Sequence, residues 1–333
     1  MVTTPSRDSR VEIPSDSEVF CISHRDDPDG ISSAALVRCA TACRFNLASY
    51  EDIERILAGL PRGLDWLVVA DLGLDERREL ISRLPMAARH VLYVDHHLLS
   101  AGAKKDLRRA NVIVRHSLND CASVLIWDTL RRRLPARAIS LASYGAMTDP
   151  PGSGRLTREV FLRTSWNLGG YEGHLLALAL SSHKCTTRLR EAMVTRLASL
   201  QLPHQISPVR RLADHQATVM LKIQKQLYDR VQVKGRVAIA PSGQLALGTS
   251  AELLLGFPEV VATVVHGKAK TPSWMRVSVR GTDECNQHLG KLLRGISRTV
   301  GGSGGGHMLA AGAMVPSSQL KRFLNLFVSN IGD

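Results

Sequence analysis

The sequence predicts an α/β protein of two domains, the first built on a mainly parallel sheet. Three observations lead to this prediction. With 333 residues, the chain is longer than one hydrophobic core usually serves, because single cores stop growing near ~250–300 residues. Its first part alternates short, almost continuously apolar runs with helical stretches, a pattern typical of parallel strands that are buried on both faces. Strands then return after a long helical region, which indicates a second, smaller α/β unit.

Five apolar runs are the expected strands of the first sheet. They comprise residues 18–23, 44–49, 65–71, 90–95 and 111–116. Helical stretches lie between most of them, for example GISSAALVRCA at 30–40 and LDERRELISRL at 74–84. Two amphipathic stretches follow near 119–133 and 136–147, so the helical pattern continues beyond the last of these strands.

The second half begins with a helical region that reaches about residue 230, where apolar residues recur at helical spacing. Strands are expected again at 236–241, 259–266, 274–280 and about 309–315, with helices near 284–299 and 317–329. The expected organisation is a polar tail at 1–17, a catalytic domain at 18–195, a helical linker at 196–232 and a second α/β domain at 233–333.

The chain is strongly basic. Lys plus Arg number 43 and Asp plus Glu number 30, which gives a formal net charge of +13. Such an excess favours polyanions as partners, because Lys and Arg contact phosphates and release counterions. Clusters such as AKKDLRRA at 103–110 and LRRRLPARA at 130–138 contribute to it, although each alone is also typical of a solvated helix face.

Other features argue against a membrane or secreted protein. No apolar run approaches the roughly 20 residues that span a bilayer. The start, MVTTPSRDSRVEIPSDSE, has no apolar segment of the kind found in signal peptides. The six cysteines show no C-x-x-C spacing and are expected to be reduced thiols. We therefore expect a cytoplasmic protein with no membrane partner.

Acidic and imidazole side chains follow several of the expected strands. They are Asp27 and Asp29 after the first strand, Asp71 at the end of the third, Asp95, His96 and His97 at the end of the fourth, and Asp149 after the helix at 136–147. Taken singly, each Asp is more typical of a turn or a helix cap, and a His pair at a strand end is more typical of a solvated loop. Because ligands gather outside the carboxyl ends of strands in open α/β sheets, we expect these side chains to meet at one edge.

So many carboxylates at one edge would repel one another, and bound cations relieve that repulsion. Carboxylate oxygen and imidazole nitrogen suit Mn²⁺, Mg²⁺ or iron, and suit Zn²⁺ less because no Cys accompanies them. The sequence therefore predicts a metal centre at this edge of the sheet.

The motifs, in this order, resemble those of the DHH phosphoesterase family with its associated C-terminal domain. D-x-D-G-x-S-S-A at 27–34 is similar to the first motif, Asp71 to the second, Asp95-His96-His97 to the third and G-A-M-T-D at 145–149 to the fourth. GGGHMLAAG at 304–312 resembles the substrate-binding signature of the associated domain. The matching motifs extend from residue 19 to residue 316, and the resemblance implies a metal site in the cleft between the two domains.

The resemblance also implies a role for each site residue. Asp71 would bridge two cations, Asp27 would bind one of them, and Asp29, His96 and Asp149 would bind the other. His97 would face the phosphate, while Asp95 would orient a neighbouring imidazole. Two divalent cations are implied, with Mn²⁺ expected and Mg²⁺ as the alternative.

The first motif departs from the family pattern. Several relatives place a His four residues before the first Asp of D-x-D, where this chain has Ser23. His24 lies one residue later, and an additional acid, Asp26, precedes Asp27. Three completions of the first metal site therefore stay open: His24 through a shifted loop, Asp26, or water.

The run GGSGGG at 301–306 has two interpretations. Such runs are often flexible linkers. Alternatively, the backbone N–H groups of Gly304, Gly305 and Gly306 form a nest for a phosphate, with His307 beside it. Arg280 matches the S-x-R pattern of the family and would form a fork on phosphate, although a strand-end ion pair is the simpler explanation. The second domain is thus expected to hold one end of the substrate.

The resemblance implies hydrolysis of phosphodiesters by two-metal chemistry. A compact chain of two domains favours short single-stranded ends, and an aromatic content of 5% does not favour an extended stacking platform. We expect a RecJ-like, Mn²⁺-dependent exonuclease that degrades short single-stranded RNA or DNA to nucleoside monophosphates.

Two alternatives stay open. The first is a phosphodiesterase for cyclic dinucleotides or nucleotides. The second is a replication or repair scaffold of the same superfamily that has no activity, which the complete set of metal motifs disfavours. The sequence also leaves open a homodimer and association with a replication or repair partner.

Overall fold

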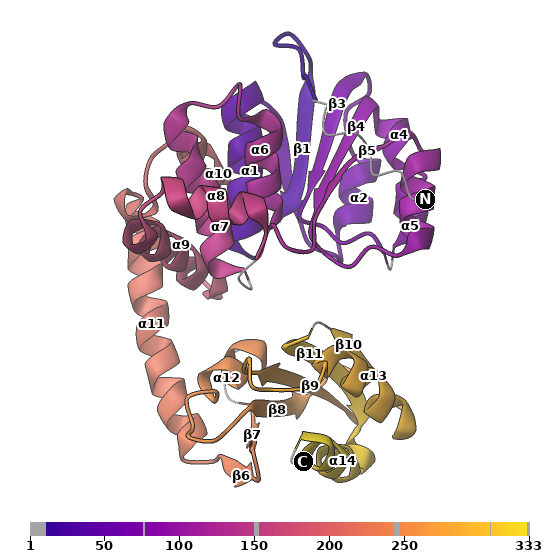
Figure 1. Ribbon diagram of the computed structural model, residues 1–333, viewed down its shortest axis with the longest axis vertical. Helices are drawn as coiled ribbons and strands as arrows, with labels where there is room; N and C mark the ends of the chain where they lie inside the picture. Colours follow the sequence, from indigo (N-terminus) through magenta and orange to yellow (C-terminus); the bar gives the residue numbers. More distant parts are fainter. Residues whose placement is uncertain (1–10, 76, 150–152, 243–246, 307, 332–333) are drawn as a thin grey trace. The chain divides into compact units, whose positions relative to one another are not determined.

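The computed structural model describes residues 11–75, 77–149, 153–242, 247–306 and 308–331. The chain divides into two compact units, one up to residue 216 and one from residue 217 onward (Figure 1). Each unit has its own sheet and its own hydrophobic core.

The first unit contains a five-stranded sheet in which all strands are parallel. Its strands are β1 (Val19–His24), β2 (Arg44–Ala48), β3 (Leu64–Ala70), β4 (Ala88–Asp95) and β5 (Ile113–His116). Their order is β2-β1-β3-β4-β5, so the direction in which strands are added reverses between β1 and β3. Ligands in open α/β sheets bind outside the carboxyl ends of the strands at such a switch point. The expected parallel α/β sheet is confirmed.

Helices cover both faces of this sheet (Figure 1). One layer comprises α1 (Pro28–Thr41), α6 (Ala122–Leu130), α7 (Ile139–Thr148), α8 (Arg155–Arg163), α9 (Trp166–Ser181) and α10 (Thr187–Ala198). The other comprises α2 (Ile53–Ala58), α3 (Arg78–Ile81), α4 (Leu84–Ala87) and α5 (Ala101–Arg109). In β1, Val19 and Cys21 enter the first core whereas Phe20 and Ile22 enter the second. Burial on both faces is why the strand is apolar throughout.

Two segments differ from the expected organisation. Ile13, in the expected polar tail, is buried in the first core. The helix α11 (Ser207–Tyr228) lies within the expected linker and crosses from one unit to the other. Its Val209 packs in the core of the first unit, and its Leu227 packs in a core of the second. Among the described residues, no helix is long and apolar enough to cross a membrane.

The second unit contains a mixed sheet of six strands. They are β6 (Gln232–Lys234), β7 (Val237–Pro241), β8 (Ala262–Lys268), β9 (Trp274–Gly281), β10 (Ser303–Gly306) and β11 (Ala310–Pro316), in the order β10-β11-β9-β8-β7-β6. Only the β7–β8 pair is parallel among these described strands. The helices α13 (Leu289–Thr299) and α14 (Leu320–Ile331) cover one face, and α12 (Leu247–Leu253) packs with the end of α11 on the other.

The glycine run forms a strand where a nest was expected. Gly304 to Gly306 belong to β10, which pairs antiparallel with β11, and within the run only Gly301 and Gly306 have positive φ. Glycine is required because other groups approach the strand closely. A Cβ atom on Gly304 would lie 2.9 Å from Oγ of Ser297, and one on Gly290 of α13 would lie 1.9 Å from the carbonyl oxygen of Gly306.

Candidate metal centre

The first side of the centre is the turn between β1 and α1. Asp27 caps α1: its Oδ1 accepts the backbone N–H of Gly30 at 2.9 Å, while its Oδ2 lies 2.7 Å from Nδ1 of His24. A Cβ atom on Gly30 would lie 2.3 Å from the carbonyl oxygen of His24, so only glycine allows the helix to begin this close to the strand. Burial acts to raise the pKa of Asp27, but the hydrogen bond from His24 outweighs it and the pKa falls to about 2.

Asp71 lies at the middle of the centre, directly after β3. Its backbone has φ of +57°, a conformation that side chains other than glycine rarely adopt, and its N–H donates to the carbonyl of Val94 at 2.9 Å. The side chain is 1% exposed, and its buried Oδ2 has no hydrogen-bond partner among the described residues. Burial, and then the charges of Asp27 and Asp29, hold the pKa of Asp71 well above its usual range. A buried oxygen without a partner at a strained backbone position is what a bound cation would satisfy.

Asp29 and Asp149 form the other side. Asp29, in the first turn of α1, accepts the backbone N–H groups of Ala122 and Ser123 at the start of α6, at 2.8 and 2.9 Å. Asp149 follows α7, and its Oδ2 lies 3.1 Å from Nε2 of His96. Burial, together with the charges of Asp29 and Asp27, raises the pKa of Asp149 to about 8.

His97 belongs to a chain of hydrogen bonds. Its Nδ1 donates to Oδ1 of Asp95 at 2.8 Å, and the hydroxyl of Tyr93 donates to Oδ2 of Asp95 at 2.7 Å. Burial acts to lower the pKa of His97, but the hydrogen bond with Asp95 outweighs it and the pKa rises. Asp95 is fully buried and is thereby occupied in holding His97.

The donor atoms gather into three groups, in each of which all atoms lie within 4.8 Å of one another. The groups are His24, Asp27 and Asp71; Asp71, His96 and His97; and Asp29, His96 and Asp149. Asp71 and His96 each belong to two groups, so the centre can hold more than one cation. Carboxylate and imidazole donors without thiolate fit Mn²⁺ or Mg²⁺.

The structure therefore brings together all of the first-unit residues that the sequence marked, while their roles as ligands stay predictions. Of the two side chains proposed to complete the first group, His24 faces the centre. Asp26 instead lies 3.5 Å from Arg25 and 3.4 Å from Arg190 of α10. Tyr50 was not marked: it follows β2, and its hydroxyl lies 3.3 Å from Nε2 of His97. Its position directly after an apolar run was the one signal in the sequence.

The residues marked in the second unit are only partly described. Arg280, in β9, is half-buried and donates to the carbonyl of Val279 at 3.0 Å. Burial lowers its pKa, against the charge of Glu252. A Cβ atom on Gly248 would lie 2.7 Å from Nη2 of Arg280, so glycine leaves space beside the guanidinium. Gly304, Gly305 and Gly306 lie in β10, and His307 lies outside the described residues.

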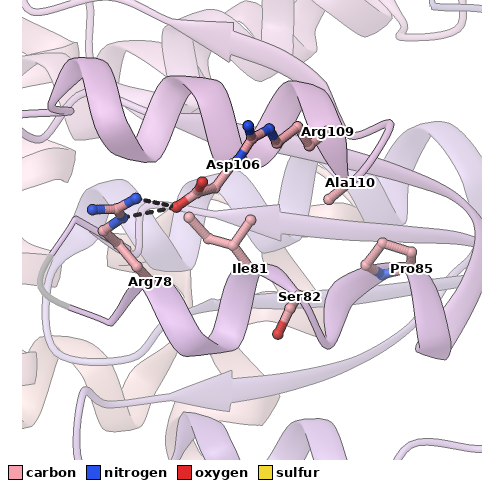
Figure 2. Close-up of a pocket in the computed structure, with 7 residues that line it drawn as sticks. All are labelled: Arg78, Ile81, Ser82, Pro85, Asp106, Arg109 and Ala110. Atoms are coloured by element: carbon pink, nitrogen blue, oxygen red, sulfur yellow. Dashed lines mark hydrogen bonds and ion pairs between the residues drawn. The ribbon is translucent and has the colours of Figure 1, made fainter.

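A separate hollow of about 370 Å³ lies on the outer helical layer, between α3, α4 and α5 (Figure 2). Arg78 and Asp106 form an ion pair at its edge, and Ile81 and Pro85 contribute apolar surface. It shares no residue with the centre and holds no group that suggests chemistry.

A doubly wound sheet with a carboxylate and histidine centre at its switch point defines the class of protein, and the comparisons agree with it. Residues 243–333 match the DHHA1 domain. Over 95% of this chain, the structure resembles the DHH domain of a member of a ribosomal protein family (TM-score 0.75, 14% identity, 87% of that chain). It also resembles the pGpG-specific phosphodiesterase PggH from Vibrio cholerae (TM-score 0.62, 14% identity, 94% of this chain and 98% of that chain).

A third similar structure is the exonuclease RecJ bound to manganese (TM-score 0.60, 14% identity, 95% of this chain and 90% of that chain). No curated protein matches the chain. The chain thus carries a DHHA1 domain and has the fold of DHH proteins, which confirms the resemblance predicted from the motifs.

Proposed function

We propose that the chain is a divalent-metal-dependent phosphodiesterase, acting as an exonuclease that degrades short single-stranded RNA or DNA to nucleoside monophosphates. One observation carries the proposal: ligand-type side chains from separate segments surround the buried Oδ2 of Asp71, which has no hydrogen-bond partner among the described residues. Without cations, the carboxylates repel one another strongly enough to raise the pKa of both Asp71 and Asp149.

The ligand sets follow from the groups. His24, Asp27 and Asp71 would hold one cation, and Asp29, His96 and Asp149, with Asp71 between the two sets, would hold the other. When bound, two divalent cations supply Lewis acidity at the phosphate and lower the pKa of water toward neutrality.

The other polar residues orient the substrate. Asp95 holds Nδ1 of His97, which leaves Nε2 to donate a hydrogen bond to a phosphate oxygen and stabilise the charge that develops there. Asp29 is held by the start of α6, so the ligands on that side are fixed before substrate binds. The centre needs no covalent nucleophile from the chain.

Several observations support a nucleotide substrate. The net charge of +13 favours a polyanion. The similar structures include an exonuclease with bound manganese, which supports Mn²⁺, and a phosphodiesterase specific for pGpG. The latter substrate has two nucleotides, and a phosphodiesterase for dinucleotides or cyclic dinucleotides is therefore the second candidate. A scaffold without activity is disfavoured because the ligand set is complete.

The test uses 5′- and 3′-end-labelled RNA and DNA of graded length, together with pGpG and a cyclic dinucleotide, digested with Mn²⁺ or Mg²⁺. We expect mononucleotides from the short single strands. Asp71→Asn, which keeps the shape of the side chain, excludes a contaminating nuclease. Cleavage of the cyclic dinucleotide alone would favour the second candidate. A protein that binds cations yet cleaves none of these substrates would overturn the proposal.

A further inference from the structure

Tyr50 enters the centre from a turn that is fixed on two sides. The turn follows β2, and the backbone N–H of Ser49 donates to Oδ1 of Asp52 at 2.7 Å. Arg25, the residue after His24, donates to Oδ2 of the same Asp52 at 2.7 Å. The position of Tyr50 is therefore tied to the end of β1, where the first ligand group begins.

The side chain of Tyr50 contacts three segments of the centre. Its hydroxyl accepts the backbone N–H of Gly73 at 3.3 Å and lies 3.3 Å from Nε2 of His97. Its ring centroid lies 5.6 Å from that of His24 and 6.4 Å from that of His97, edge to face with the latter. A Cβ atom on Gly73 would lie 3.2 Å from Cβ of His97, so this glycine allows the close approach.

A role in packing alone does not explain this arrangement. Tyr50 is half-buried and belongs to neither hydrophobic core of the first unit, unlike the nearby Tyr93. Burial raises the pKa of Tyr50 to about 12, so the hydroxyl keeps its proton at neutral pH. With one lone pair used by Gly73, the hydroxyl still has a lone pair and a proton. It can therefore pair with Nε2 of His97 in either protonation state.

We propose that Tyr50 is a positioning residue for hydrolysis, which holds the imidazole of His97 at Nε2 while Asp95 holds it at Nδ1. With both ring nitrogens held, the imidazole is oriented before a phosphate arrives. Less reorganisation is then needed in the transition state. This inference rests on the proposed function, because it assigns Tyr50 to the same reaction.

The kinetic test compares Tyr50→Phe with wild type, alone and in the background of His97→Ala. Loss of one neutral hydrogen bond should lower kcat about two- to tenfold, with KM and metal content almost unchanged. Because Tyr50 acts through His97, Tyr50→Phe should add no further loss once His97 is alanine. The matched control is Tyr171→Phe on the surface of α9, which should leave kcat unchanged in both backgrounds. An equal loss of kcat from Tyr50→Phe in both backgrounds would overturn the inference.

A second measurement does not depend on hydrolysis. In metal-free protein with ¹⁵N-labelled histidine, the side-chain nitrogens of His97 are assigned by their absence in His97→Ala. Tyr50→Phe should shift the Nε2 resonance of His97, and Tyr171→Phe should not. An unchanged His97 resonance would overturn the inference even in an active enzyme. Conversely, a shifted resonance in a protein without activity would count against the proposed function and leave the hydrogen bond established.

Discussion

Nε2 of His96 lies 3.3 Å from Oδ1 of Asp71, the carboxylate that two of the ligand groups share. The same nitrogen lies 3.1 Å from Oδ2 of Asp149. His96 thus connects the strained residue after β3 with the residue that follows α7. Its neighbour His97 faces Asp95 instead, although the two imidazole centroids are only 4.6 Å apart.

This difference predicts distinct losses for two adjacent substitutions. His96→Ala should remove a ligand, so bound metal falls and activity falls with it. His97→Ala should keep the metal but lower kcat roughly 10–100-fold, the range found when a group that supports a metal site is removed. Metal content by elemental analysis and kcat with short oligonucleotides check both. Equal metal loss in the two variants would show that His97 is a ligand.

A second prediction concerns the space that Gly145 leaves for Asp29. A Cβ atom there would lie 2.4 Å from Oδ1 of Asp29 and 2.3 Å from Oγ of Ser123, and both side chains are buried. Gly145→Ala should therefore destabilise the protein by about 1–3 kcal/mol and displace Asp29 from the second cation. Thermal unfolding and metal titration measure the two effects.

The control for this substitution is Gly170→Ala in α9, where nothing lies within 4 Å of the added methyl group. It should leave metal binding unchanged and stabilise the helix by roughly 0.5–1 kcal/mol. Normal metal binding in Gly145→Ala would show that Asp29 is not held by this contact.

The raised pKa of Asp149 predicts how stability depends on pH without metal. Its pKa rises from 3.8 to about 8, so the folded state binds this proton more tightly than the unfolded state. The stability from this group is full below about pH 4 and is lost as pH rises to about 8. Relative to Asp149→Asn, which cannot titrate, the chelator-treated wild type should lose on the order of 2–4 kcal/mol across that range.

Denaturant unfolding at several pH values, for both proteins with chelator and with Mn²⁺, measures this loss. Mn²⁺ should restore wild-type stability at high pH, because cations replace the proton as the partner of the carboxylates. Parallel curves for the two chelator-treated proteins would show that Asp149 does not titrate in this range.

Much of the first unit was predictable because local chemistry and tertiary structure agree there. Strands buried on both faces must be apolar throughout, and the polar residues that end them mark one sheet edge. The choice between His24 and Asp26 was not predictable, since it depends on Arg190, which comes from a helix far along the chain and lies 3.4 Å from Asp26.

Tyr50 and the strand β10 were missed for a related reason. An aromatic residue after a strand is no metal ligand, and Tyr50 reaches His97 only because β2 lies beside β1. Glycine has low strand propensity, so pairing with β11 and packing of α13 give Gly304 to Gly306 their extended conformation. Both features depend on the order of strands rather than on local sequence.

The last prediction separates anchoring of the substrate from chemistry. Arg280 is half-buried beside Gly248, and its guanidinium is expected to bind a phosphate of the substrate. Arg280→Ala should lower kcat/KM for a dinucleotide about ten- to a hundredfold, the cost of about 1.5–3 kcal/mol for one charge-assisted hydrogen bond. Longer strands make other phosphate contacts, so the defect should shrink for five- and fifteen-nucleotide substrates, with metal content unchanged.

Arg276→Ala is the matched control, because Arg276 is exposed on the same strand and its loss changes the net charge equally. It should lower kcat/KM slightly and by a similar factor at every length, through the general field of the protein. The comparison therefore removes the contribution of overall charge. A defect of Arg280→Ala that does not change with length would count against anchoring of a substrate phosphate. Identical behaviour of the two variants would reduce Arg280 to one of many basic surface residues.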